Sequence, residues 1–163
     1  VIMNTGLPTG KGKPSEAFLA WRSHAETHPD LQVGQSIRGG MAHPEKITKE
    51  IVAAYDAPFP DVTYKAGAAV WPLIVPISPD DPASTEMRHA REVLSKWNKP
   101  ALVMFSDKDP ITGGGDKFFR SLIPTAKEQP EIIIKDAGHF LQEEKGEEIS
   151  QHILDFIKRT PVT

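Results

Sequence analysis

The chain has 163 residues, of which 39% are hydrophobic and 25% are charged, and its formal net charge at pH 7 is −3. This composition is that of a globular protein rather than a disordered one, and the scattered charges and short apolar runs argue against binding to nucleic acid or to a membrane. The sequence contains no cysteine, which excludes disulfides, thiolate metal sites and a thiol nucleophile.

The first hundred residues are predicted to be mostly helical after one short strand. Val1–Met3 is an apolar, β-prone run before a turn-rich segment, as expected of a buried strand that leads into a loop. Apolar residues spaced three and four apart then predict four helices, and residues 31–41 fit no single pattern. The predicted helices cover residues 15–28, 44–55, 65–74 and 83–97. Prolines indicate the joints between them, with residues 72–82 as a proline-rich connector.

The last 65 residues change to an alternation of strands and helices. Residues 101–105 form a continuous apolar run of strand length, which favours a strand buried on both faces of a parallel sheet. A helix is predicted over 116–123, a second buried strand over 132–134, and an amphipathic helix over 147–158. This order is typical of an α/β layer.

Reactive side chains follow both of these strands at their carboxyl ends. Asp109 lies in Ser-Asp-Lys-Asp-Pro after residues 101–105, and His139 lies in Asp-Ala-Gly-His-Phe after residues 132–134. Open parallel sheets bind ligands at this edge, and an acid followed by a histidine matches the last two members of the hydrolase order nucleophile, acid, base. Singly, each has a simpler interpretation, because Asp109 suits a loop cap and Gly-His suits a turn with a solvated imidazole. Together they favour an acid–base pair.

Both motifs resemble those of the α/β-hydrolase fold. Residues 136–144, Asp-Ala-Gly-His-Phe-Leu-Gln-Glu-Glu, are similar to the haloalkane dehalogenases, and the resemblance extends upstream through residues 3–10 and 55–67. It implies a partial α/β-hydrolase fold, in which parallel sheet strands carry an inserted helical cap and the N-terminal half with the nucleophile is missing. The implied segments are a core strand and loop over 1–12, the cap over 13–96, and the C-terminal core over 97–163.

The same resemblance implies hydrolysis of carbon–halogen bonds. An Asp nucleophile, absent from this chain, would displace halide from a small halogenated aliphatic substrate. His139 would then activate the water that hydrolyses the resulting ester, with Asp109 as the acid. Phe18 and Trp21 match a cap helix whose tryptophan binds the halide, and Trp71 falls where the family has an aromatic residue lining the pocket; on spacing alone, Trp21 favours helix packing. No cofactor and no metal are expected.

The missing nucleophile leaves alternatives open. An epoxide hydrolase or a serine esterase of the same fold is the first, because the residue that would decide is not in the sequence. The second is a non-enzymatic truncated module that associates with itself. We expect the chain alone to be inactive, soluble and cytoplasmic. We also expect it to associate, either with the missing N-terminal segment or with a second copy, because its first strand exposes an apolar edge.

Overall fold

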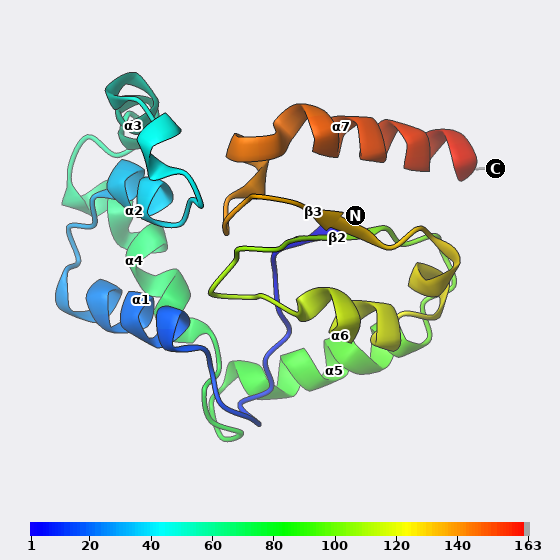
Figure 1. The fold of residues 1–163 in the computed structure, drawn as a ribbon. Coiled ribbons are helices and arrows are strands. Elements are labelled where there is room, and N and C mark those ends of the chain that lie inside the picture. The colour runs from blue at the N-terminus through cyan, green and yellow to red at the C-terminus, as the bar shows by residue number, and fades with distance from the viewer. Residues whose placement is uncertain (162–163) are drawn as a thin grey trace.

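The computed structural model describes residues 1–161, which form a three-stranded parallel sheet with helices on both faces (Figure 1). The strands are β1 (Ile2–Met3), β2 (Val103–Ser106) and β3 (Ile132–Ile134), in the spatial order β1-β2-β3. All three lie where the sequence predicts strands. Because they are parallel, their carboxyl ends meet at one edge of the sheet.

The central strand β2 is buried on both faces, as its continuous apolar run predicts. Alternate side chains of residues 101–105 enter two separate hydrophobic clusters, because successive side chains of a strand point to opposite faces. One cluster includes α7 (Leu141–Arg159) and the other includes α6 (Gly115–Leu122), with α5 (Ala83–Ser95) alongside α6 (Figure 1). The result is an α/β layer that is covered on both sides.

A group of four helices lies to one side of the sheet, between β1 and α5 in the chain (Figure 1). These helices are α1 (Glu16–Thr27), α2 (Val33–Gly39), α3 (Lys49–Asp56) and α4 (Ala66–Ile74). Short 3-10 turns occur at Pro44–Lys46, Val62–Lys65 and Pro124–Glu128. In the helical group α1 packs on α4 and α2 packs on α3. Arg22 of α1 fixes the first pair by donating hydrogen bonds to the carbonyl oxygens of Pro72 (2.7 Å) and Val75 (3.1 Å).

The helical group falls within residues 13–96, the range predicted for the cap, and the predicted division of the chain into segments stays a prediction. Helix α5 falls inside the predicted cap range of 13–96, yet it packs against α6 of the core. The predicted core segment 97–163 includes residues 162–163, which lie outside the described residues.

Several helix boundaries differ from the prediction for local reasons. The helix predicted over 44–55 begins at Lys49, because Thr48 caps it by accepting a hydrogen bond from the backbone N–H of Ile51 (3.3 Å). Pro72, predicted to start a connector, instead lies inside α4. Helix α7 begins at Leu141 rather than 147 and contains a break at Lys145, whose φ of −137° is not helical. The charged first turns of α7 carry no apolar period that could have predicted them.

Candidate active site

The turn after β2 buries the carboxylate of Asp109. Its side chain has 0% exposed surface, and it accepts hydrogen bonds from the backbone N–H of Ile111 (2.8 Å) and from the hydroxyl of Thr112. Burial raises the pKa of this carboxyl, but hydrogen bonds from His139 and Thr112 outweigh burial and hold the pKa below its ordinary value. Asp109 is therefore ionised at neutral pH.

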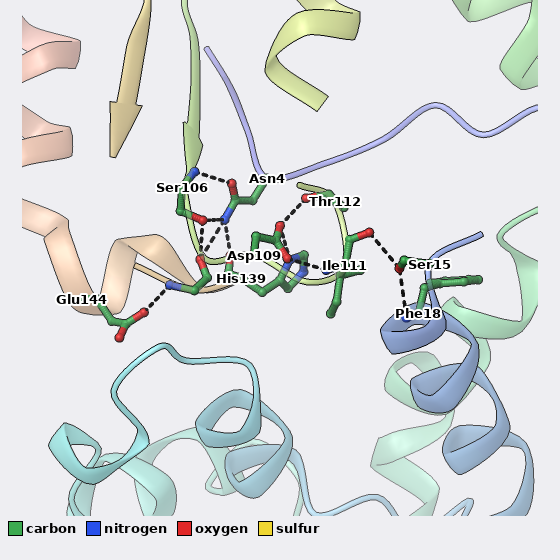
Figure 2. Close-up of polar contacts among 10 residues, drawn as sticks. Asn4, Ser15, Phe18, Ser106, Asp109, Ile111, Thr112, His139 and Glu144 are labelled. Carbon is green, nitrogen blue, oxygen red and sulfur yellow. Dashed lines mark hydrogen bonds and ion pairs between the residues drawn. The ribbon is translucent and has the colours of Figure 1, made fainter. Parts of the chain in front are cut away.

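His139 reaches Asp109 from the turn after β3 (Figure 2). Its Nδ1 lies 3.0 Å from Oδ2 of Asp109, and its side chain is 21% exposed. Because an ionised carboxylate can only accept hydrogen bonds, Nδ1 must carry the proton in the neutral imidazole. The lone pair then lies on Nε2, where it can accept a proton. The two predicted residues are thus brought together in an arrangement suited to general base chemistry.

A buried asparagine ties the ends of the three strands together behind this pair (Figure 2). Asn4 directly follows β1, donates from Nδ2 to Oγ of Ser106 (2.8 Å), and accepts at Oδ1 from the backbone N–H of Ser106 (3.0 Å). The same amide nitrogen donates to the carbonyl oxygens of Gly138 and His139, both at 2.9 Å. Residues after β1 and at the end of β2 therefore hold the loop that carries His139.

His139 also lines a cavity of about 640 Å³ between the sheet edge and the helical group. Its apolar lining includes Phe18, Trp21, Met87, Ile111 and Phe118. Phe18 and Trp21 contact each other edge to face, with ring centroids 6.0 Å apart. The lining also includes the cationic side chains of Lys11, Lys13 and Arg91. A cavity with apolar walls and a few polar groups, among them His139, suits a small organic ligand.

Ser15 joins the helix that carries Phe18 and Trp21 to the turn after β2, which carries Asp109. Its Oγ accepts a hydrogen bond from the backbone N–H of Phe18 (3.2 Å), which caps α1, and donates to the carbonyl oxygen of Ile111 (3.0 Å). The N–H of Ile111 in turn donates to Asp109. Helix α1 and the carboxylate are therefore held in one connected set of hydrogen bonds (Figure 2).

Trp71, predicted to line the pocket, does not contact the cavity within residues 1–161. Its surface is 64% exposed, and it is absent from the cavity lining. The reason is its place on α4, where Pro72 is fully buried. Adjacent residues of a helix point about 100° apart, so burial of Pro72 turns Trp71 outward.

Trp97 and the paired histidines of α1 also lie outside the cavity. Trp97, two residues after α5, is 37% exposed, with Nζ of Lys99 5.8 Å from its ring centroid, so it does not belong to the buried core. His24 and His28 stack with their ring centroids 4.4 Å apart. Residues 1–161 contain no group of three or more His, Asp or Glu side chains able to hold a metal ion. Over the same residues, no helix has both the length and the apolar character needed to cross a membrane.

Sequence reasoning missed three polar residues that support the pair. Asn4 ends a strand at the same sheet edge, which was a usable signal, but it was interpreted as part of a turn. Ser106 is visible in the sequence only as the first residue of the Ser-Asp-Lys-Asp-Pro motif that contains Asp109. Thr112 carries no pattern that separates it from an ordinary loop residue, and its contact with Asp109 emerges only from the folded turn.

No protein-family model matches the chain. A haloalkane dehalogenase from Psychrobacter cryohalolentis is 44% identical over 158 residues, which is 97% of this chain and 52% of that protein. One from Mycobacterium marinum is 41% identical over 156 residues, covering 96% of this chain and 52% of that protein. The chain is haloalkane dehalogenase-like.

A solved structure supports the same relation for this dehalogenase-like chain. The tetrameric haloalkane dehalogenase DpaA from Paraglaciecola agarilytica NO2 aligns with a TM-score of 0.77 and 29% identity, over 94% of this chain and 50% of that one. The chain thus spans about half the length of the relatives it matches. The predicted resemblance is confirmed, and so is the fold class, a partial α/β-hydrolase fold with three parallel strands.

Proposed function

We propose that this chain carries the acid and the base of a hydrolase that cleaves carbon–halogen bonds of small haloalkanes. The observation that supports this most is the buried, ionised Asp109, which holds the proton on Nδ1 of His139 beside an apolar cavity. The identity of 44% to a haloalkane dehalogenase supports this substrate class. The geometry alone would suit any hydrolase of this fold.

The proposed reaction has two steps, and this chain supplies the acid and the base of the second. In the first, an Asp carboxylate from outside the chain attacks the carbon that bears the halogen; a C–O bond forms, the C–X bond breaks and halide leaves. In the second, Nε2 of His139 takes a proton from a water molecule, whose oxygen attacks the ester carbonyl. The ester C–O bond at the carbonyl then breaks, and the imidazolium, which Asp109 stabilises, gives its proton to the departing oxygen, so that the alcohol is released and neutral His139 is restored. No cofactor or metal enters either step.

Trp21 is the proposed halide donor. Its indole N–H can donate a hydrogen bond to the leaving anion, and Phe18 and Met87 are among the apolar residues that line the same cavity. Phe18, in edge-to-face contact with Trp21, limits the rotation of the indole and adds to the apolar wall. Trp71 can contact the substrate only if a segment outside residues 1–161 brings the substrate to α4, and we keep its predicted role on that condition.

The nucleophile is proposed to come from a segment that pairs with the free edge of β1. Within residues 1–161, β1 pairs only with β2, and Val1 is 55% exposed. An apolar hollow lined by Ile2, Leu7 and Phe119 lies along the same edge. An unpaired edge favours the addition of a strand. A second copy of this chain would cover the edge but would supply the same residues again, so a different segment is required for catalysis.

The test is a comparison of substrates with the complete protein, meaning this chain together with the segment that supplies the nucleophile. We expect bromide release from 1,2-dibromoethane, and much slower hydrolysis of a short ester and of a terminal epoxide. Trp21→Phe should lower kcat/KM for bromide release about tenfold or more, because a hydrogen bond to a charged group contributes ~1.5–3 kcal/mol. Trp97→Phe, far from the cavity, should leave the rate unchanged.

Each other outcome points to a specific alternative. Ester or epoxide turnover without bromide release would reject the dehalogenase proposal and favour a related hydrolase. Loss of the bromide signal equally in Trp21→Phe and Trp97→Phe would remove Trp21 from the halide site. A native mass of two or more copies, with no turnover in any form of the protein, would favour the self-associating, non-enzymatic module.

A further inference from the structure

The backbone N–H and carbonyl groups of Gly138 and His139 form hydrogen bonds with residues from other parts of the chain. The N–H of Gly138 donates to Oε2 of Glu144 (2.7 Å), and the N–H of His139 donates to the carbonyl oxygen of Gly40 (2.7 Å). Both carbonyl oxygens accept from Asn4. All four backbone polar groups are therefore satisfied: two by Asn4 after β1, one by Glu144 of α7 and one by Gly40 of the helical group.

Glu144 links this loop to the helical group through one carboxylate, whose hydrogen bond to the loop is drawn in Figure 2. Besides the N–H of Gly138, Oε2 accepts from the N–H of Ala42 (3.1 Å), and Oε1 accepts from the N–H of His43 (2.8 Å). Among the described residues, the hydrogen bonds to these two oxygens come from backbone N–H groups alone. Hydrogen bonds to an ionised acceptor are about twice as strong as neutral ones, so this contact is a firm link between two segments a hundred residues apart.

Two glycines allow the segments to meet backbone to backbone. A Cβ added at Gly138 would lie 2.5 Å from the nitrogen of Ala42 and 2.5 Å from the carbonyl oxygen of Gly40. A Cβ added at Gly40 would lie 2.6 Å from the ring of Phe140. At Gly138 the loop that carries His139, here called the base loop, lies directly against the backbone of residues 40–42, so a shift of one segment must move the other.

A second contact lies beside Glu144, between residue 43 of the helical group and the turn after β3. Nε2 of His43 lies 2.8 Å from Oδ2 of Asp136, although the angle does not make a hydrogen bond, and Lys108 also pairs with Asp136. All three of these residues are at least one-quarter exposed, so the contact is screened by solvent. The half-buried Glu144 therefore dominates the link between the loops.

We infer that Glu144 is a positioning residue for His139: by binding the N–H groups of Gly138, Ala42 and His43 it locks the base loop to the helical group. This inference rests on the proposed function, since it assigns Glu144 to the base of that reaction. A displacement of about 1 Å in a catalytic group can lower the rate about 10²-fold. A change at Glu144 can therefore leave the protein folded and still move the imidazole of His139 out of the position that catalysis requires.

The test compares Glu144→Gln with Glu147→Gln in the complete protein. Both changes remove one negative charge from α7, but Glu147 is exposed and touches neither loop. We expect Glu144→Gln to broaden or remove the low-field NMR signal of the Nδ1 proton of His139 and to lower kcat for bromide release about 10- to 100-fold, with KM within about twofold. Glu147→Gln should leave both unchanged, and Glu144→Asp, which keeps the charge with a shorter reach, should give a partial loss.

The two readouts separate the inference from the proposed function. If the unaltered protein releases no bromide, the proposed function fails, while the signal of His139 still reports on Glu144. If Glu144→Gln folds and keeps both the signal and kcat, the inference is overturned. If Glu144→Gln does not fold, Glu144→Asp decides: a weakened signal in the folded variant supports the inference, and an unchanged signal overturns it.

Discussion

Replacing Asp109 by Asn is expected to slow bromide release from 1,2-dibromoethane by about 10⁴-fold, the effect seen when the acid of a Ser-His-Asp triad is changed in this way. The carboxylate of Asp109 accepts from Nδ1 of His139 and leaves the lone pair on Nε2. An amide N–H in the same place would donate to Nδ1 and move the proton to Nε2. The base would then be unable to take a proton from water. Steady-state kcat measures the loss of rate, and the ¹⁵N chemical shifts of the imidazole report which nitrogen carries the proton.

Asp107→Asn is the matched control for Asp109→Asn. Asp107 lies in the same turn, accepts a hydrogen bond from the N–H of Asp136 (2.7 Å), and does not touch His139. Its replacement should change kcat by less than about threefold and leave the tautomer of His139 as it is. A fall of less than tenfold in Asp109→Asn, or an equal fall in both variants, would show that Asp109 is not the acid.

Leu102→Ala is expected to destabilise the fold by about 2–5 kcal/mol. Leu102 is 0% exposed between β2 and α7, where it packs in a cluster with Ile149 and Phe156. Removing its branched end leaves a cavity that the surrounding strands and helix cannot fill without moving. Since whole domains are stable by only about 5–15 kcal/mol, this loss is large.

Urea denaturation of the chain measures the expected change in its free energy of unfolding. Leu154→Ala is the control, because Leu154 lies on α7 with 51% of its surface exposed. Its truncation should change stability by less than about 0.5 kcal/mol. Equal midpoints for the two variants would contradict the burial of Leu102 against α7.

The sheet could be predicted from the sequence because its strands are short apolar runs bounded by turn residues. Residues 132–134 match β3, and residues 101–105 overlap β2. The convergence of Asp109 and His139 was also predictable, since parallel strands bring their carboxyl ends to one edge. The start of α7 was not, because Leu141 is followed by charged residues and by the break at Lys145.

The support of the pair could not be predicted, because it depends on contacts between distant residues. Asn4 and Ser106 are 102 positions apart, and so are Ala42 and Glu144. No local period or propensity encodes such contacts. The exposure of Trp71 was missed for a related reason: the resemblance gave its place along the chain, but the burial of Pro72 decided which way α4 turns.

The most direct test of the central claim, that His139 is the base of a dehalogenase, is to trap the ester. In the complete protein, His139→Gln should still allow halide displacement but not hydrolysis, so that 1,2-dibromoethane gives about one equivalent of bromide and then stops. Mass spectrometry should find one bromoethyl group attached to the protein, whereas the unaltered protein should turn over continuously without an adduct. Continued turnover by His139→Gln, or turnover of 1,2-dibromoethane that leaves no adduct when His139 is replaced, would contradict the account.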